Sequence, residues 1–114
     1  MKIGQVDTSS RVALIAEVGN NHEGSANRAE DLIEAAFAAG ADAVKLQTFV
    51  PELFVSSLQV ERLEMLRGFS LPTEELQRLV ENFGSRGMTV FSTPLDLVSL
   101  QRLESAPLIK ISSG

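Results

Sequence analysis

The sequence contains no cysteine, tryptophan or tyrosine. Without cysteine the protein can form no disulfide, no thiolate metal site and no cysteine nucleophile. Its aromatic residues are six phenylalanines, too few for the stacked platforms that hold single-stranded nucleic acid. No apolar run approaches the roughly 18 residues of a membrane-spanning helix, and the start MKIGQVDTSS has no apolar signal-peptide core. We therefore expect a cytoplasmic protein that does not enter a membrane.

An excess of positive charge is also missing. The 114 residues carry 10 lysines and arginines against 15 acids, a formal net charge of -5. Nucleic acid is held by clustered basic residues, so we expect no nucleic acid partner. Any bound anion must instead be met by a few local positive groups. Hydrophobic residues make up 44% and charged residues 22% of the chain, which is typical of one modest folded domain.

What the sequence does contain is an alternation of strand and helix patterns. Four apolar runs predict strands buried on both faces: 11–17, 42–48, 88–92 and 108–112. Three helices are expected between them, with Ser25, Thr73 and Asp96 as the capping residues at their starts. The long connection after the second strand contains a hint of a short helix near 60–66.

Strands that alternate with helices favour parallel pairing with right-handed crossovers. Two architectures share this pattern, a doubly wound open sheet and a (β/α)₈ barrel. The sequence stops at Ser113 and Gly114, directly after the fourth expected strand and without a covering helix. We therefore expect an α/β fold in which residues 1–114 are about four β/α units, the first half of a TIM barrel whose second half this chain lacks.

Polar residues follow the expected strands at their carboxyl ends, where ligands bind in parallel α/β folds. Lys45 and Lys110 each lie between two aliphatic residues, and an unpaired ammonium group is costly to bury. With Ser92 and Thr93 on the same rim, these lysines would suit a phosphate and a carboxylate. The alternative is that Lys45 forms a buried ion pair with Glu17 and binds nothing.

Two residues in and just after the first expected strand need separate interpretations. Glu17 ends an apolar strand, where burial can tune a carboxyl pKa, so it is the candidate acid or base, with a purely structural role as the alternative. His22 is the only histidine, and we expect it to be a hydrogen-bonding turn residue rather than a metal ligand. The surrounding GNNHEG lacks the spacing of phosphate-binding glycine loops.

Four ordered stretches together resemble the N-terminal part of the barrel in the N-acetylneuraminate (sialic acid) synthase family. They are IAEVGNNHEG at 15–24, AGADAVKLQTF at 39–49, FSTPLD at 91–96 and IKISSG at 109–114. The resemblance implies a transferase of carbohydrate biosynthesis that condenses phosphoenolpyruvate with N-acetylmannosamine or a related amino sugar. The expected products are a nonulosonic acid and phosphate.

The resemblance also implies roles for individual residues. Those that it assigns to phosphoenolpyruvate are Lys45, Gln47, Thr93, Lys110 and Ser113. It assigns Glu17 to catalysis, as the group that manages water or a proton at the tetrahedral intermediate. A divalent metal, Mn²⁺ or Mg²⁺, is implied for the full-length protein, with its two histidine ligands on later strands outside this chain.

Other expectations concern the whole protein. The resemblance implies a homodimer with a C-terminal antifreeze-like domain that this chain lacks, so we expect the isolated chain to be inactive. The connection 49–71 looks shorter than is typical of the family, which leaves the acceptor sugar open. Two alternatives remain. One is a non-catalytic half-barrel that serves only folding or assembly, and the other is a related phosphoenolpyruvate-dependent 2-keto sugar acid synthase.

Overall fold

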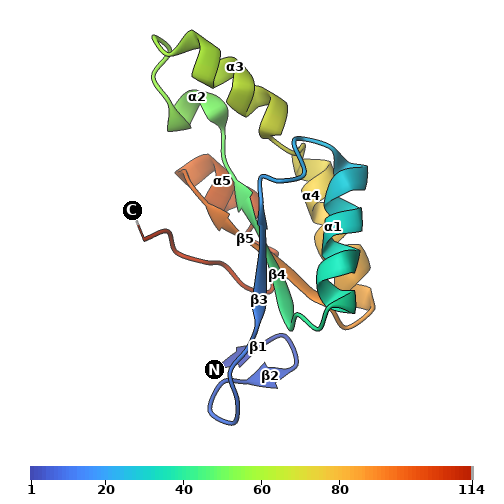
Figure 1. The fold of residues 1–114 in the computed structure, drawn as a ribbon. Helices are drawn as coiled ribbons and strands as arrows, with labels where there is room; N and C mark the ends of the chain where they lie inside the picture. Colours follow the sequence, from blue (N-terminus) through green and yellow to red (C-terminus); the bar gives the residue numbers. More distant parts are fainter. Residues whose placement is uncertain (114) are drawn as a thin grey trace.

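The computed structural model describes residues 1–113 as a parallel three-stranded sheet with helices packed against it (Figure 1). In chain order the elements are β1 (Lys2–Ile3), β2 (Val6–Asp7), β3 (Ile15–Gly19), α1 (Ala26–Ala38), β4 (Ala43–Thr48), α2 (Pro51–Phe54), α3 (Val60–Phe69), α4 (Thr73–Ser85), β5 (Thr89–Pro94) and α5 (Leu97–Arg102). The sheet order is β3-β4-β5. The predicted α/β alternation with parallel strands is therefore confirmed. Within residues 1–113, no helix is long and apolar enough to cross a membrane.

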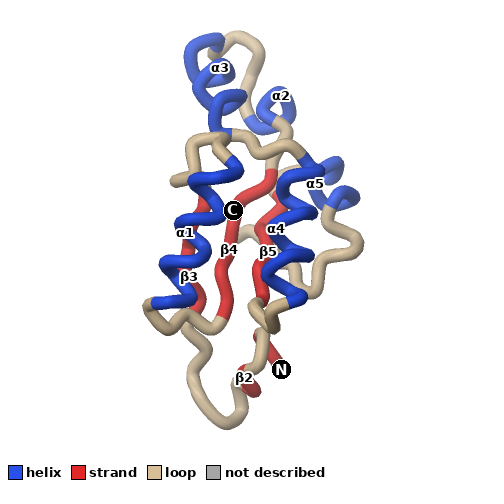
Figure 2. Tube along the Cα trace, turned by 90° about the vertical axis from the view of Figure 1, so that its right-hand side faces the viewer, coloured by secondary structure: helices blue, strands red, loops and turns tan. Residues whose placement is uncertain are grey.

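One face of the sheet is covered by α1 and α4 (Figure 2). Successive residues of a strand point to opposite faces, so alternate strand residues meet these helices. The buried residues of this interface are Val18, Ala29, Ile33, Val44, Leu46, Leu76, Leu79, Phe83 and Val90. Each large aliphatic or aromatic side chain buried there contributes about 1.5–3 kcal/mol relative to exposure. This layer is the main core of the chain.

Two of the three expected helix caps are confirmed. The Ser25 side chain accepts a hydrogen bond from the backbone N–H of Arg28 at 3.2 Å, at the start of α1. Asp96 accepts from the N–H of Ser99 at 2.7 Å, at the start of α5. The third cap is wrong, because α4 begins at Thr73 itself and Pro72, which has no side-chain acceptor, holds the cap position.

The first strand begins four residues later than predicted, at Ile15. Residues 11–14 are instead tied to the loop before β4, since Asp42 accepts from the guanidinium of Arg11 at 2.7 Å and from the N–H of Leu14 at 2.8 Å. The parallel ladder with β4 starts only at the Ile15 and Ala43 pair. Burial on both faces is also wrong for β3, because Ile15 remains 40% exposed on the side without helices.

The fourth predicted strand, 108–112, is reduced to one parallel bridge between Ile109 and Ser92. There the N–H of Lys110 donates to the carbonyl of Ser92 at 3.1 Å. Ladder bonds on one side of a strand recur every two residues, so the next donor on β5 would be residue 94. Residue 94 is a proline and has no N–H, which explains why regular pairing stops after the bridge.

Two features were not predicted. Strands β1 and β2 form an antiparallel hairpin around Gly4 and Gln5, with Gly4 at φ +61°. A glycine at the first central position is a hairpin signal that the sequence did offer. The hairpin lies at the amino ends of the strands, whereas α2 and α3 stand beyond their carboxyl ends (Figure 1). The connection 49–71 thus holds two helices, of which only the second was anticipated.

Candidate active site

The face of β3, β4 and β5 that α1 and α4 leave uncovered, called the inner face below, carries the candidate site. Pairing in register aligns Glu17 with Lys45, and Lys45 with Phe91. One step toward the carboxyl ends, Gln47 is aligned with Thr93. Because alternate residues share a face, these side chains belong to the same surface. Parallel pairing therefore joins three of the four sequence motifs at one place.

Lys45 is the centre of this arrangement. Its Nζ forms an ion pair with Oε2 of Glu17 and donates to Oγ1 of Thr93 at 3.0 Å. The Lys45 side chain is 18% exposed, but that of Glu17 is 48% exposed. The ion pair considered from the sequence is thus present, while the expected burial of Glu17 is wrong. An ion pair open to water on one side contributes little to stability, so an incoming anion can compete for the ammonium group.

A cavity of about 250 Å³ lies on the inner face beside this pair. Its charged lining residues are Glu17, Lys45 and Lys110, and the apolar ones are Met1, Ile3, Ile15, Phe91, Leu108 and Ile109. Lys110 is exposed, and its Nζ donates to the carbonyl of Ile111. Two ammonium groups and one carboxylate beside an apolar wall form a site with a positive balance. Such a site favours a small anion.

The other predicted site residues do not line this cavity. Thr93 joins the site through its hydrogen bond with Lys45. Gln47 lies on the same surface, and its Oε1 accepts from Nδ2 of Asn20 at 3.0 Å. Ser113 is exposed and also lies outside the cavity lining. Ser92, expected on the same rim, is fully buried on the helix-covered side, where its hydroxyl lies 2.7 Å from that of Thr48. The structure therefore gathers Glu17, Lys45, Thr93 and Lys110.

His22 has the turn role that was predicted for it. It is 1% exposed, and its Nδ1 accepts from the N–H of Gly24 at 2.9 Å. Burial lowers the pKa of His22 below its usual value, so the ring stays neutral with its proton on Nε2. That Nε2 and Oδ1 of Asn20 are buried and have no hydrogen-bond partner among residues 1–113. Buried polar atoms of this kind commonly bind an internal water.

The part of the chain that the structure describes offers no metal site. No group of three histidine, cysteine, aspartate or glutamate side chains within residues 1–113 could hold a metal ion. His22 does not fit as a ligand either, because Nδ1 is already engaged by Gly24 and the ring is enclosed.

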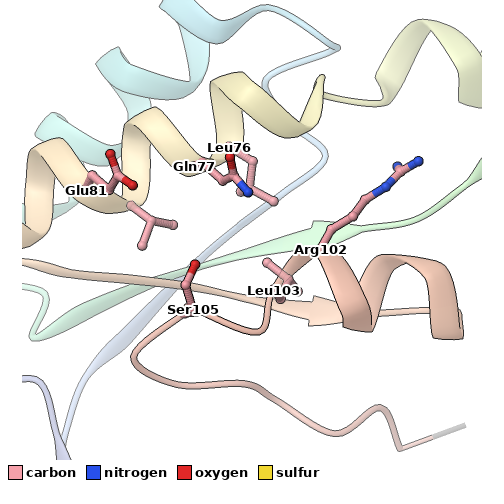
Figure 3. Close-up of a pocket in the computed structure, with 8 residues that line it drawn as sticks. Leu76, Gln77, Glu81, Arg102, Leu103 and Ser105 are labelled. Carbon is pink, nitrogen blue, oxygen red and sulfur yellow. The ribbon is translucent and has the colours of Figure 1, made fainter.

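A second cavity, of about 90 Å³, lies on the other side of the molecule between α4 and residues 102–106 (Figure 3). Leu76 and Leu103 form part of its lining, and Glu81 and Arg102 extend from different elements at separate ends of it. No motif from the sequence contributes to it. The cavity is a gap in helix packing rather than a second place where charged groups converge.

Two contacts near the site were not predicted from the sequence. Nδ2 of Asn20 donates to Oε1 of Gln47 and so fixes the carbonyl end of the Gln47 amide. Asp96 was interpreted only as a helix cap, yet its Oδ2 also accepts from the N–H of Val50 at 2.7 Å. No periodicity signals such contacts, because the residues that they join lie 27 and 46 positions apart in the chain.

Comparisons with known proteins give a consistent result. A sequence model of the NeuB family matches residues 32–114. An N,N'-diacetyllegionaminic acid synthase of Legionella pneumophila is 36% identical over 117 residues, covering 89% of this chain and 33% of that protein. A pseudaminic acid synthase of Campylobacter jejuni is 31% identical over 120 residues, covering 91% of this chain and 35% of that protein.

A solved structure extends the likeness to the fold. The N-acetylneuraminic acid (sialic acid) synthetase of Leptospira borgpetersenii, in complex with citrate, matches with a TM-score of 0.80 at 29% identity. The match covers 88% of this chain and 35% of that one. The chain thus spans about a third of the length of its relatives. Its fold is that of the first part of a (β/α)₈ TIM barrel, as predicted.

Proposed function

The chain belongs to the NeuB family, and we propose that it forms the phosphoenolpyruvate-binding part of a nonulosonic acid synthase. The observation that carries the proposal is the position of Lys45. Its ammonium group contacts Glu17 on one neighbouring strand and Thr93 on the other, and Lys110 lines the same cavity. Phosphoenolpyruvate brings a phosphate and a carboxylate, and two ammonium groups with a hydroxyl donor are complementary to them.

The proposed reaction assigns a task to each of these groups. The C=C electron pair of phosphoenolpyruvate bonds its methylene carbon to the aldehyde carbon of the amino sugar, and the aldehyde oxygen takes up a proton. Water adds at the adjacent, phosphate-bearing carbon and gives up a proton. The tetrahedral intermediate then breaks its C–O bond to phosphate and becomes the ketone. Lys45 and Lys110 bind the anionic groups of phosphoenolpyruvate, and the hydrogen bond to Thr93 orients the Lys45 ammonium group. The half-exposed Glu17 carboxylate can take a proton from the added water, as a general base.

Gln47 and Ser113 enter the proposal with different support. The Asn20 amide occupies Oε1 of Gln47, which leaves the Gln47 NH₂ group as a donor for an acceptor oxygen of the substrate. Ser113 ends the described part of the chain and is assigned to phosphoenolpyruvate by the family resemblance alone. Of the two, Gln47 has the stronger structural support.

The acceptor is proposed only as a class. The relatives named above are synthases of three different acids, N,N'-diacetyllegionaminic, pseudaminic and N-acetylneuraminic acid, so the likeness to them does not select one acceptor. We further propose a divalent metal, Mn²⁺ or Mg²⁺, bound by residues outside this chain, a homodimeric whole protein that works in the cytoplasm, and residues 1–114 as the N-terminal part of its barrel domain. The isolated chain is expected to be inactive.

The test is phosphate release by the full-length protein. Phosphoenolpyruvate, each of several amino sugars and a divalent metal are supplied together, and then each is omitted in turn. We expect release only when all three are present, with one sugar clearly preferred. Omission of the sugar is the key control, because phosphate release without it indicates simple hydrolysis. No turnover with any amino sugar would contradict the proposal.

A second candidate, an assembly unit without catalysis, is favoured by the exposed apolar residues. Val12, Leu14 and Ile111 are 80%, 62% and 83% exposed, and they flank the outer strands of the sheet. Such edges are prone to pairing with another chain. Light scattering distinguishes the candidates when it is combined with the assay. Stable dimers without turnover support the assembly unit, and turnover supports the synthase.

A further inference from the structure

Residues 49–71, called the α2–α3 lobe below, pack around a core of their own. Its buried members are Phe49, Val55, Leu63 and Leu66, and Leu95 from the end of β5 packs against them. This cluster is separate from the core between the sheet and helices α1 and α4. Of the lobe residues, Leu71 also packs against the main core. The position of the rest of the lobe depends on Leu95 and on the contacts at the two ends of the lobe.

Both ends of the lobe are attached to the carboxyl-end loops. At the C-terminal end of the lobe, a Cβ added to Gly24 would lie 2.1 Å from the carbonyl oxygen of Gly68, so the two backbones are in contact. At the N-terminal end of the lobe, the N–H of Val50 donates to Oδ2 of Asp96 at 2.7 Å. The first contact is steric, whereas the second is a directional hydrogen bond to a carboxylate, which is among the stronger kinds.

The Asp96 carboxylate divides its two oxygens between two tasks. Oδ1 accepts from the N–H of Ser99 and so caps α5. Oδ2 accepts from the N–H of Val50 and, at 3.0 Å, from the Ser99 hydroxyl. Burial acts to raise the pKa of Asp96, but the N–H donors of Val50 and Ser99 outweigh it and lower that pKa. The group is therefore a carboxylate near neutral pH, with both oxygens available as acceptors.

The lobe stands beyond the carboxyl ends of β4 and β5, the end from which ligands enter parallel barrels (Figure 1). The groups proposed to hold phosphoenolpyruvate, Lys45 and Thr93, belong to the strands below it. A second substrate that approaches them from outside the barrel passes the lobe. The lobe therefore flanks the approach of the amino sugar. The hydrogen bonds of Asp96 go to Val50 and Ser99, whereas Lys45 of the anion site donates to Thr93.

We infer that Asp96 is a positioning residue, which through Oδ2 and the Val50 N–H holds the α2–α3 lobe beside the path of the amino sugar. The inference rests on the proposed function. It differs from a capping role because the cap uses Oδ1 and the lobe uses Oδ2. The two roles can therefore be separated by substitution.

Asp96→Asn and Asp96→Ser test the inference in the full-length protein. Asparagine and serine are both good N-cap residues, so α5 keeps its cap. Neither offers a second acceptor oxygen, so the Val50 bond is lost while the Ser99 N–H is capped. We expect the KM for the amino sugar to rise about tenfold, with the KM for phosphoenolpyruvate within twofold of wild type. Amide hydrogen exchange at Val50 should accelerate by a similar factor.

Ser99→Ala is the matched control. It removes the hydroxyl that donates to the same Oδ2 but leaves both backbone donors, so the sugar KM and the Val50 exchange rate should stay at wild-type values. An unchanged sugar KM in both Asp96 variants would overturn the inference, as would an equal rise in both KM values. In either case an active wild type still supports the proposed function. A wild type without turnover would instead remove the proposed function itself, and this inference with it.

Discussion

The two faces of the β3-β4-β5 sheet are built from the same three strands, yet they differ in nearly every property. The face under α1 and α4 is buried and mostly apolar, with Val44, Leu46 and Val90 at 1% exposure or less. The inner face carries Glu17, Lys45 and other polar groups around an open cavity. Alternation along each strand lets one segment contribute to both surfaces. Stability is therefore concentrated on one face and the proposed chemistry on the other.

The largest effect expected from this comparison is on the covered face. Leu79→Ala removes a side chain with no exposed surface and should lower the free energy of unfolding by about 3–5 kcal/mol, through lost burial and the cavity left behind. Leu97→Ala is the matched control, since Leu97 is 78% exposed, and it should stay within about 0.5 kcal/mol of wild type. Urea denaturation measures both. Equal losses would show that burial under α1 and α4 does not determine the stability.

The inner face should show the opposite behaviour. Lys45→Met should lower kcat/KM for phosphoenolpyruvate by about 10²–10³-fold, because a preorganised charged donor to the substrate is lost. The urea midpoint should barely change, since the Glu17 partner is half exposed. Lys2→Met, at an exposed position of β1, is the control and should leave turnover unchanged. A Lys45 variant that keeps full activity would contradict the proposed site.

A smaller effect is expected where α1 begins. Ser25→Ala removes the side-chain acceptor for the Arg28 N–H and should reduce the free energy of unfolding by about 1 kcal/mol. Ser25→Gly should cost only a few tenths of a kcal/mol. Thermal or urea unfolding distinguishes the two variants. If Ser25→Ala lowers the free energy of unfolding no more than Ser25→Gly does, the Ser25 cap contributes little to the stability of the covered face.

The smallest effect concerns acid stability where residues 11–14 meet the sheet. Hydrogen bonds from the Arg11 guanidinium and the Leu14 N–H lower the pKa of Asp42 from 3.8 to about 2. The stabilising contribution of the Asp42 carboxylate is thus fully present above pH 3.8 and is lost as the pH falls through about 2. The free energy of unfolding should therefore fall less steeply with pH over this range in Asp42→Asn than in wild type. Leu97→Ala, at an exposed position, changes no ionisable group and should keep the wild-type slope.

Much of the fold could be predicted because local patterns and tertiary structure agree on the covered face. The helix periodicity, the Ser25 and Asp96 caps and the apolar cores of β4 and β5 all appear as expected. The failures have tertiary causes. Pairing with Asp42 delays the first strand, and Pro94 interrupts the ladder at the fourth. Neither effect follows from the local pattern of the segment concerned.

The candidate site divides in the same way. Lys45 was recognisable from the sequence because a charged residue within an apolar strand needs a partner or a ligand. The same reasoning was applied to Lys110, but Lys110 is exposed and lies outside a regular strand. That Lys45 contacts both Glu17 and Thr93 follows only from the register of three strands. Gln47 and Ser113 do not line the cavity at Lys45, so their assignment to phosphoenolpyruvate stays a prediction.

The sequence by itself determined the alternation of strands and helices and which residue types reach the carboxyl ends, because both follow from local periodicity and turn chemistry. Only the tertiary structure decided which of those residues meet. It also gave Asp96 its second partner and kept Glu17 open to water. The physical reason is that hydrogen-bond partners and burial depend on segments far apart in the chain, and local pattern carries no record of how those segments pack.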